Sequence, residues 1–371
     1  MKNTWADPSI YLDQIFVEKS CSSHPYTAEI VERAGLPVEL VEPHEFPELV
    51  SGQYPGNLGI GKKKLLLCRN SGAFLKDCPG TREYRCCDYR IINVGLGCPM
   101  DCVYCILQAY LNTPFLSFFI NIDEMFTELS QKIDRYEGDI MRIGTGEFTD
   151  SMALDRITGL SRHLVKFFAT QNKAVLELKT KSANIANLKH LEHNNRTIVA
   201  WSLNAQNIVA TEEIRAATID QRLEAAAQVV GWGYKCAFHF DPIIAFPGWQ
   251  DGYRQVIYRL FEVVPAESIK WISLGGFRYL PALKSISTAR CGHSNIFFHE
   301  FIEGLDGKQR YFRPFRVQLY KEIYRELKGF ADVGTCIYFC MESDEIWQDV
   351  MGFVPSDRGG VGAMLDNTVR L

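Results

Sequence analysis

No run of apolar residues in this 371-residue chain approaches the roughly 20 that a membrane-spanning helix needs. The amino-terminal stretch has neither the apolar core nor the small-residue cleavage site of a secretory signal, so we expect a cytoplasmic protein without a membrane partner. Charge of one sign is not in excess either, because 40 Lys and Arg residues balance 44 Asp and Glu residues. This balance argues against binding of polyanions by the whole surface, although a local basic groove remains compatible with it.

The composition excludes several further classes of protein. An aromatic content of 12% is too high for a disordered chain, and 28 Gly and 15 Pro residues are too few for a collagen-like one. Cysteine, in contrast, is plentiful, with 12 residues, seven of which lie between Cys68 and Cys105. Since thiols stay reduced in the cytoplasm, this clustering indicates metal or redox chemistry more than a framework of disulfides.

The chain divides into three parts by its patterns. Residues 1–88 are rich in Pro and Gly and are predicted to form an irregular, cysteine-containing N-terminal extension with one short helix at Thr27–Ala34. From residue 89, short β-branched runs alternate with helical patterns, which predicts an α/β fold of βα units around a parallel sheet. Six such units within residues 89–330 favour a partial (βα)6 barrel of the TIM type, and residues 331–371 are predicted to add a strand, a helix and a C-terminal tail. The predicted strands are Arg90–Val94, Ile140–Ile143, Ala174–Leu178, Thr197–Leu203, Lys235–Phe240 and Ile269–Leu274, and the predicted helices between them are Asn121–Arg135, Asp155–Ala169 and Ile219–Val230.

The loop after the first predicted strand carries three cysteines spaced C-x3-C-x2-C, namely Cys98, Cys102 and Cys105. In barrels of βα units the active site lies at the carboxyl ends of the strands, which is where this loop falls. Three thiolates on one short loop suit three irons of a 4Fe–4S cluster and leave the fourth iron open to a ligand. The alternatives are a structural zinc loop and three reduced core thiols.

This motif, with the aromatic Tyr104 inside it, resembles that of the radical S-adenosylmethionine (AdoMet) enzymes, the radical SAM superfamily. The resemblance implies that AdoMet binds the open iron through its amino and carboxylate groups. It also implies that reduction of the cluster cleaves AdoMet to methionine and a 5′-deoxyadenosyl radical. A closer resemblance, to the spore photoproduct lyase family, rests on segments that match in order between residues 105 and 253. These segments are Cys105–Tyr110, Phe119–Glu124, Lys179–Lys181, Trp201–Asn204, Asp220–Ala226, Gly233–Lys235, Asp241–Ile243 and Gly248–Tyr253.

Members of that family repair a UV-induced thymine–thymine adduct in DNA by direct radical reversal, so the resemblance implies a lyase of DNA repair. It also implies a set of AdoMet contacts. Tyr104 would pack near the adenine, Lys181 would pair with the AdoMet carboxylate, and Ser202, with Asn204 nearby, would hydrogen-bond AdoMet. The alternatives are a tyrosine that only packs the loop, a solvated lysine and a packed serine.

A glycine-containing segment at the end of the second predicted strand is a further candidate contact. In radical AdoMet enzymes a segment of this kind offers backbone groups to the methionyl amine. Here the resemblance implies that role for Gly144, Gly146 and Glu147, and glycine suits a position where a ligand approaches the backbone closely.

Two residues depart from the family's pattern. The family has a hydrogen-donating cysteine where this chain has Glu147, and a tyrosine after the third cluster cysteine where it has Ile106. Because a carboxylate cannot donate a hydrogen atom as a thiol can, another residue must donate or the reaction must differ. Cys236, Cys336 and Cys340 lie on predicted strands and are candidate donors, with inert buried thiols as the alternative.

Two side chains at the end of the fifth predicted strand point toward the expected catalytic face. Asp241 is a candidate for orienting a substrate group, whereas His239 is predicted to be a satisfied core histidine. Glu147, Asp241 and Cys236 are therefore the candidate catalytic residues.

Four further cysteines, Cys68, Cys78, Cys86 and Cys87, precede the first barrel strand. They are candidates for a second metal centre, either a second 4Fe–4S cluster or zinc, that could relay electrons. Their spacing lacks the C-x2-C pairs of common zinc sites, and the adjacent Cys86 and Cys87 rarely bind one ion together. Reduced or redox-linked thiols are the alternative.

Basic and aromatic residues alternate in Phe277–Tyr279 and in Lys308–Arg316. These stretches could line a groove for nucleic-acid phosphates and bases. Alternatively, the second stretch begins an amphipathic helix with Phe315, Leu319 and Ile323 inward and its arginines in solvent.

Three functions remain open at this point. The first is a radical AdoMet enzyme that acts on a UV lesion in DNA and receives electrons from a donor such as flavodoxin or ferredoxin. The second is the same chemistry on RNA, a peptide or a small molecule with help from a second metal centre. The third is a non-enzymatic iron–sulfur or zinc module that binds nucleic acid.

Overall fold

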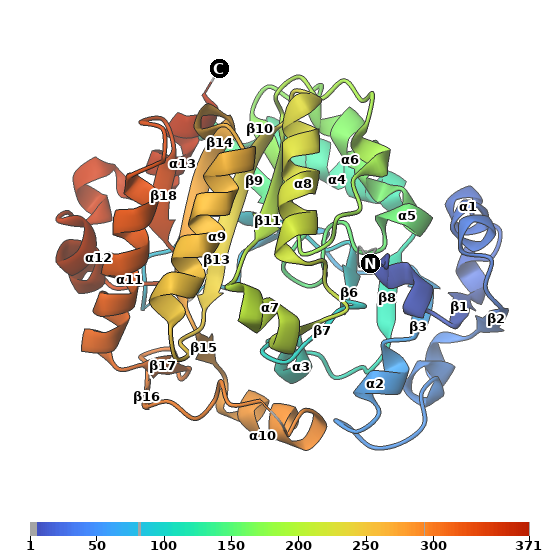
Figure 1. Ribbon diagram of the computed structural model, residues 1–371. Helices are drawn as coiled ribbons and strands as arrows, with labels where there is room; N and C mark the ends of the chain where they lie inside the picture. The colour runs from blue at the N-terminus through green and yellow to red at the C-terminus, as the bar shows by residue number, and fades with distance from the viewer. Residues whose placement is uncertain (1–5, 81–82, 293, 371) are drawn as a thin grey trace.

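The largest sheet of the protein has eight strands that curl around a common interior (Figure 1). The computed structural model describes residues 6–80, 83–292 and 294–370. Across the sheet the strands are β18 (Cys336–Phe339), β14 (Ile269–Gly276), β13 (Lys235–Ile243), β11 (Thr197–Ser202), β10 (Ala174–Thr180), β9 (Met141–Gly144), β5 (Arg90–Ile92) and β4 (Leu75–Asp77). All neighbouring pairs are parallel except β4 and β5, which are antiparallel. The predicted α/β half-barrel is therefore confirmed.

All six strands predicted for the barrel are present, with ends that differ from the prediction by a few residues. The clearest is β11, in which every residue is buried. A parallel strand is covered on both faces, so it appears in the sequence as a continuous apolar run. That run is the signal on which the prediction depended.

Helices between the strands cover the outer face of the sheet, with α8 (Ile219–Gly231) and α9 (Trp249–Val263) in front of it in Figure 1. The start of α8 is set by its sequence, because the Thr218 hydroxyl accepts from the Gln221 backbone N–H (3.3 Å) and the Gln221 side chain accepts from the Thr218 N–H (2.8 Å). Further helices are α4 (Ile122–Asp134), α6 (Leu160–Phe168) and α11 (Arg313–Lys328).

The single helix predicted at Asp155–Ala169 is wrong in one respect. The chain forms a short helix α5 (Asp155–Thr158), breaks at Gly159 and continues as α6. Gly159 has a φ of +62°, a left-handed conformation that glycine adopts at little cost and that ends a helix. The sequence predicts a single helix because apolar residues recur at helical spacing on both sides of this glycine.

Residues before 89 are more regular than predicted. They supply β1 (Gln14–Glu18), β2 (Val38–Val41), β3 (Lys64–Cys68) and helix α1 (Pro25–Ala34). A second sheet, in the order β2-β1-β3-β8-β6, joins these strands to β8 (Leu116–Phe119) and β6 (Gly95–Leu96). The prediction of the α1 helix is confirmed. The prediction of an otherwise irregular extension is wrong, because strands of four or five residues between prolines leave little pattern in the sequence.

The carboxyl-terminal part of the chain completes the half-barrel. A small three-stranded sheet has the order β15 (Arg278–Tyr279), β17 (Gln309–Tyr311) and β16 (Phe301–Glu303). Helix α10 (Pro281–Arg290) follows β15, and α12 (Asp344–Met351) and α13 (Gly360–Val369) follow β18. The strand and helix predicted within residues 331–371 are present, and β18 is an edge strand of the main sheet, so this segment contributes to the barrel itself. The three-part division of the chain stays a prediction.

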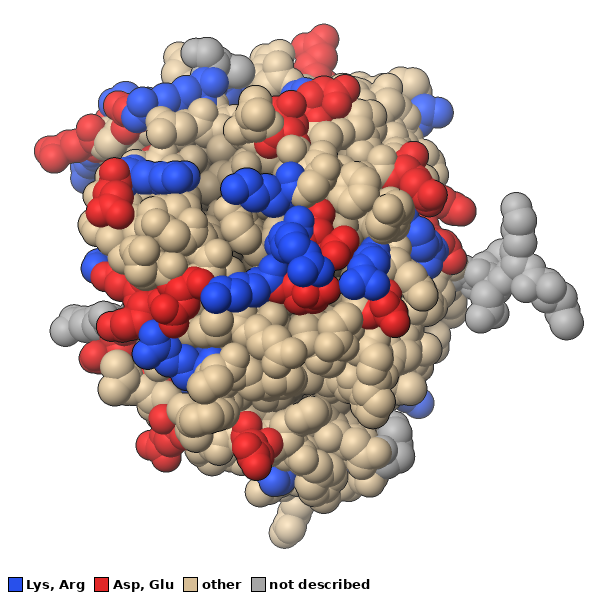
Figure 2. Space-filling model, turned by 60° about the vertical axis from the view of Figure 1, so that its left-hand side comes forward, with Lys and Arg blue, Asp and Glu red and all other residues tan. Residues whose placement is uncertain are grey.

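One face of the molecule shows how the near-balance of charge is distributed. Figure 2 shows acidic and basic side chains intermixed on the face that α11 and α12 form at the left of Figure 1. Ion pairs there include Arg254 with Glu322 (3.2 Å) and Arg313 with Asp349 (2.7 Å). This face is therefore not a basic groove. No helix in the described ranges is long and apolar enough to cross a membrane.

The packing around β9 predicts a cost for any side chain at Gly144. A Cβ atom there would overlap the Tyr89 hydroxyl and lie 2.8 Å from the backbone oxygen of Glu177. We expect Gly144→Ala to lower the free energy of unfolding by about 1–3 kcal/mol, because overpacking forces the neighbours to shift. Urea unfolding measures this change.

The matched control is Gly231→Ala at the end of α8, where an added Cβ would meet nothing within 4 Å. This substitution should leave the unfolding midpoint unchanged or raise it slightly, since alanine favours a helix over glycine. Equal midpoints for the two variants would contradict the tight packing described at Gly144.

Candidate cofactor site

The three cysteines of the C-x3-C-x2-C motif lie on the loop that leaves β5, at the carboxyl ends of the parallel strands. The loop passes through β6 and a two-residue strand β7 (Asp101–Cys102). Gly97 has a φ of +84° and donates its backbone N–H to the Phe148 carbonyl (2.9 Å), which turns the chain just before Cys98. Cys102 is buried, while Cys98 and Cys105 are half-buried, and all three are free thiols.

Buried ion pairs hold this loop against two other parts of the chain. Asp101 accepts from Lys62 Nζ (3.1 Å) and from Arg290 Nη2 (2.8 Å). Burial alone would raise the pKa of Asp101, but the two cations hold it below its ordinary value. Lys62 is the first of three consecutive lysines, a pattern typical of a solvated segment, so its burial could not be predicted from the sequence.

A second anchor joins the loop to the start of β12 (Glu213–Ile214), which pairs antiparallel with β7. The Tyr104 hydroxyl and the Arg222 guanidinium both donate to the Glu213 carboxylate, and Arg222 also donates to the Ser202 carbonyl (2.8 Å). Burial would raise the pKa of Glu213, but Arg222 and Lys181 lower it below its ordinary value. Tyr104 therefore holds the loop in place, and its contact with adenine stays a prediction.

Lys181 lies beside this loop, as its predicted role requires. Its Nζ is 5.8 Å from the centre of the Tyr104 ring. Its backbone N–H donates to Asp150 Oδ2 (2.8 Å), and the Thr180 hydroxyl donates to Asp150 Oδ1 (2.6 Å). Asp150 thus fixes the end of β10, a role that the sequence does not reveal because the partners are thirty residues away.

These residues fit a 4Fe–4S cluster that binds AdoMet. Three free thiols lie on one turn of chain, and a cation is available beside them for a carboxylate. Among the described residues, no three His, Cys, Asp or Glu side chains gather closely enough to hold a single metal ion. In a cluster each thiol binds a different iron, so the three thiols need not converge on one point.

Gly144, Gly146 and Glu147 lie at the end of β9 and just beyond it. A Cβ at Gly146 would lie 3.0 Å from Lys179 Cβ, so both glycines permit close packing of neighbouring strands. Glu147 is half-buried and pairs with Lys179 Nζ (2.7 Å). Burial would lower the pKa of Lys179, but Glu147 and Glu177 raise it above its ordinary value. The contact of this segment with the methionyl amine stays a prediction.

Ser202 and Asn204 are both buried at the end of β11. The Asn204 amide donates to the Pro242 carbonyl (2.9 Å), and its oxygen accepts from the Tyr253 hydroxyl (2.6 Å) and the Ala205 N–H (3.0 Å). Asn204 is thus fully engaged within the protein. The Ser202 carbonyl accepts from Arg222, which also donates to the Glu213 carboxylate that holds Tyr104. Ser202 is therefore part of the same network.

His239 is a satisfied core histidine, as predicted. Its ring nitrogens contact Ser273 Oγ (2.6 Å) and Glu177 Oε1 (2.8 Å). Glu177 also accepts from the Trp271 indole N–H (2.9 Å). Burial would raise the pKa of Glu177, but His239 and its other partners lower it to about 2, so this carboxylate stays charged.

Asp241 forms a two-point ion pair with Arg278, with N–O distances of 3.0 and 3.1 Å. Burial would raise the pKa of Asp241, but Arg278 lowers it below its ordinary value. Arg278 also donates to Cys340 Sγ (3.5 Å), which brings a thiol to the carboxyl end of β18. The pair therefore presents a fixed guanidinium and carboxylate at the end of the barrel where the cysteine loop lies.

The structure separates the three candidate donor thiols. Cys236 is fully buried on β13, and its sulfur lies 4.0 Å from the Ala226 carbonyl of α8, on the outer side of the sheet. Cys336 begins β18, at the opposite end of the barrel from the cysteine loop. Cys340 follows β18 at the same end as that loop. The choice of Cys236 as a catalytic residue is therefore wrong, because alternate residues of a strand face opposite sides.

The second centre predicted from Cys68, Cys78, Cys86 and Cys87 does not assemble with that set. Cys68 ends β3 in the other sheet, where burial raises the pKa of its thiol to about 12 and the nearby ionisable groups are Glu18 and Cys21. The other three do lie together, and their neighbour is Cys340. The prediction is wrong for Cys68, because this residue ends a strand of the second sheet whereas Cys78 follows a strand of the main sheet.

The two basic and aromatic stretches do not form an exposed groove. Lys308, Arg310 and Arg316 are buried, and the first two pair with Asp306 (3.3 and 2.8 Å). Arg316 lies 3.3 Å from Glu342. The helical alternative is closer to the structure, with Leu319 and Ile323 buried in α11 and Phe315 partly buried, but its first turn buries Arg316 instead of exposing it.

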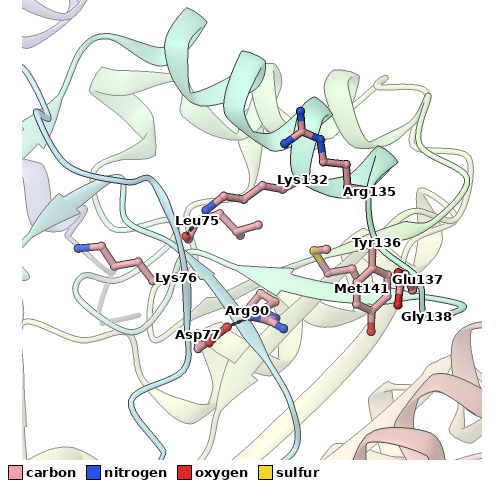
Figure 3. Close-up of a pocket in the computed structure, with 10 residues that line it drawn as sticks. All are labelled: Leu75, Lys76, Asp77, Arg90, Lys132, Arg135, Tyr136, Glu137, Gly138 and Met141. Carbon is pink, nitrogen blue, oxygen red and sulfur yellow. Dashed lines mark hydrogen bonds and ion pairs between the residues drawn. The ribbon is translucent and has the colours of Figure 1, made fainter.

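An open pocket of about 760 Å³ lies at the opposite end of the strands (Figure 3). It includes Arg90 and Met141, which begin β5 and β9, and the end of α4 with Lys132. Two of its charged residues are paired within it, since Arg90 pairs with Asp77 and Lys132 donates to the Leu75 carbonyl (2.9 Å). This pocket therefore belongs to the amino-terminal face of the barrel and not to the cofactor site.

Comparison with known proteins places these features in context. A family described as spore photoproduct lyase matches residues 82–302. Spore photoproduct lyase of Geobacillus sp. (strain Y412MC61) is 29% identical over 170 residues, 46% of this chain and 50% of that protein. The Clostridium acetobutylicum enzyme of the same name is 25% identical over 252 residues, 66% of this chain and 72% of that protein. The Bacillus subtilis (strain 168) enzyme matches over 52% of its length, so the chain spans about half of two of these relatives.

Solved structures share the fold. A spore photoproduct lyase complexed with a dinucleoside spore photoproduct aligns with a TM-score of 0.79 and 22% identity, over 88% of this chain and 98% of that one. A variant of such a lyase with bound AdoMet and the dinucleoside aligns with a TM-score of 0.79 and 21% identity, over 90% and 99%. At this identity the likeness establishes the half-barrel fold.

The buried Glu213 carboxylate predicts a measurable loss when its charge is removed. We expect Glu213→Gln to lower the free energy of unfolding by about 3 kcal/mol, because Arg222 is then buried without its anion. Since folding lowers the pKa of Glu213, its contribution is present above the ordinary glutamate range and is lost as pH falls below it. Urea unfolding at pH 7 and at about pH 4 measures both effects.

Glu224→Gln is the matched control, because it removes the same charge from an exposed position on α8. It should leave stability unchanged within about 0.5 kcal/mol at both pH values. The buried network would be refuted by a Glu213→Gln variant as stable as this control.

Proposed function

Because the chain belongs to the spore photoproduct lyase family, we propose that it is a radical AdoMet enzyme that reverses a UV-induced thymine adduct in DNA. One observation carries the proposal. Lys181, which the family resemblance assigns to the AdoMet carboxylate, lies 5.8 Å from Tyr104 within the loop of Cys98, Cys102 and Cys105. Two segments that are far apart in the sequence thus meet in the arrangement that this chemistry needs.

Cys98, Cys102 and Cys105 would hold a 4Fe–4S cluster, and Lys181 would bind the carboxylate of AdoMet. When bound, this pair of cofactors supplies a 5′-deoxyadenosyl radical that abstracts hydrogen from substrate. The protein's part is to hold the loop rigid, which Asp101 and Glu213 do through buried ion pairs. A low-potential electron donor such as flavodoxin or ferredoxin would be a partner.

Arg278 and Asp241 are proposed to position the substrate. Their two-point pair keeps the guanidinium plane fixed at the carboxyl end of the barrel, and Arg278 is the cation in contact with Cys340. A fixed guanidinium suits a phosphate or the carbonyl oxygens of a base. Glu147 is proposed to act through Lys179, by keeping that ammonium charged and in place.

Cys340 is proposed as the hydrogen donor that replaces the cysteine absent at position 147. It is half-buried at the carboxyl end of β18, and its sulfur contacts Arg278. A thiol there can give a hydrogen atom to a substrate radical held by the Arg278–Asp241 pair. Cys236 faces α8 and cannot reach the interior of the barrel.

The proposed carboxylate contact predicts a loss of AdoMet binding in Lys181→Met. We expect the anaerobically reconstituted variant to bind AdoMet about tenfold to a hundredfold more weakly, because a charge-assisted hydrogen bond is lost. Equilibrium dialysis with radiolabelled AdoMet measures this. Lys189→Met, which changes an exposed lysine in the same region, should bind as the parent does, and equal affinities of both variants would refute the role of Lys181.

The proposed reaction predicts two products from the reconstituted protein. With dithionite, AdoMet and a dinucleoside spore photoproduct, we expect 5′-deoxyadenosine and repaired thymidines, both measured by chromatography. Replacement of Cys98, Cys102 and Cys105 together by Ala should abolish both. A reconstituted protein that forms 5′-deoxyadenosine but leaves the lesion intact would point instead to RNA, a peptide or a small molecule as the substrate.

The donor assignment is tested in the same assay. Cys340→Ser should still form 5′-deoxyadenosine and should lose most of the thymidine product, because a hydroxyl is a poor hydrogen-atom donor. Cys336→Ser, at the opposite end of the same strand, should retain both products. Full repair by the Cys340→Ser variant would remove Cys340 from the mechanism.

A further inference from the structure

Three thiols lie together at the boundary of the half-barrel, and the proposed function uses none of them. Cys78 follows β4, Cys86 and Cys87 precede β5, and their neighbour Cys340 follows β18. We refer to these four residues as the thiol cluster. All four residues are half-buried.

The fold brings these residues together although β4 and β18 are opposite edges of the eight-stranded sheet. Residues 83–89, which we call the strap, run between the two edges. Arg85 donates its backbone N–H to the Glu342 carbonyl (3.0 Å) and pairs antiparallel with that residue. At the other end, Cys78 donates its N–H to the Tyr89 carbonyl (3.0 Å). The strap therefore places Cys86 between the end of β4 and the segment after β18.

The sulfur of Cys86 has the thiols of Cys78 and Cys87 and the backbone N–H groups of Cys87 and Asp88 as its neighbours. These neighbours hold the pKa of Cys86 well below its ordinary value, and the Cys86 sulfur raises the pKa of Cys78. A Cβ at Gly80 would lie 2.7 Å from the Cys86 sulfur, so glycine at this position lets the turn after Cys78 close over that sulfur.

One of the two neighbouring thiols is excluded from an unstrained disulfide with Cys86. Adjacent residues have Cα atoms about 3.8 Å apart, below the range of about 4.4–6.8 Å that disulfides span, which disfavours Cys87. Cys78 is separated from Cys86 by seven residues, so this restriction does not apply to it. A partly exposed thiolate with a second thiol beside it is the arrangement found in redox-active dithiols.

We propose that Cys78 and Cys86 are a redox-active dithiol that forms a reversible disulfide by exchange with small-molecule disulfides. The Cys86 thiolate attacks one sulfur of the reagent and releases the other sulfur as a thiolate. The Cys78 sulfur, on losing its proton, then attacks Cys86 and releases the second half of the reagent. The protein loses two electrons and one proton. The reagent takes up both electrons and leaves as two thiolates, one of which takes the proton of Cys78 and the other a proton from water.

This site goes beyond the proposed reaction and does not depend on it. The new bond would fasten the turn after β4 to the strap, beside the carboxyl end of the barrel where Arg278 and Cys340 lie. The chemical class of the reagent is a disulfide of a small thiol, for which oxidised glutathione serves as the probe.

The first measurement compares alkylation rates within one protein. The full chain, reconstituted anaerobically with iron and sulfide, receives a short pulse of iodoacetamide at about pH 6, and mass spectrometry quantifies each modified cysteine. We expect Cys86 to react at least about tenfold faster than Cys291, a half-buried thiol whose pKa burial raises. Equal rates would overturn the proposal, as would protection of Cys86 that a metal chelator relieves, since that result would indicate a metal thiolate.

The second measurement identifies the disulfide. After incubation with mixtures of reduced and oxidised glutathione, peptide mapping should find Cys78 joined to Cys86, with iron content unchanged. Cys78→Ser should trap glutathione on Cys86 instead, and Cys291→Ser should behave as the parent. A link from Cys86 to Cys87 or Cys340, or a Cys86 that stays reduced throughout, would overturn the pairing. AdoMet cleavage is assayed separately, so failure of the proposed reaction leaves this test intact.

Discussion

The buried carboxylate of Glu213 is the contact on which the candidate site depends most. It accepts from Tyr104 of the cysteine loop and from Arg222 of α8, so a loop and a barrel helix share one anion. Such a group is costly to bury, and it is stable here only because both donors are present together. The loop is therefore fixed before any cofactor binds, and its three thiols keep their places relative to Lys181. Asp101 anchors the loop in the same way, through buried ion pairs with Lys62 and Arg290.

Paired polar side chains also lie inside the half-barrel. Glu177 contacts His239, Glu147 pairs with Lys179 and Asp241 pairs with Arg278, and in each case the partners come from different segments of the chain. Each group has its partner within the protein, and together the pairs give the interior a fixed pattern of dipoles. An environment of this kind orients a polar substrate without the reorganisation that water would need.

Most of the fold and the centre of the site could be predicted from the sequence, and the reason is local. Buried parallel strands such as β11 leave continuous apolar runs, and Cys98, Cys102 and Cys105 lie within eight residues of one another. What escaped prediction depends on residues that are distant in the chain. Glu213, Asp150 and Lys62 show no pattern of their own, because their partners come from distant parts of the chain. For the same reason the predicted group of four cysteines contains Cys68, which is near the other three in the sequence. It does not contain Cys340, which is near them in space.

The strap has a consequence for how the chain reaches its final form. Arg85 pairs with Asp344 as well as with Glu342, and 259 positions separate Arg85 from Asp344. During synthesis, the amino-terminal partner is made long before its counterpart leaves the ribosome. The two edges of the main sheet can be joined only at that late stage, so closure is among the most non-local events of folding. Until then the cysteines beside the strap are open to the surrounding medium, and a nascent chain is at its most vulnerable to oxidation in this interval.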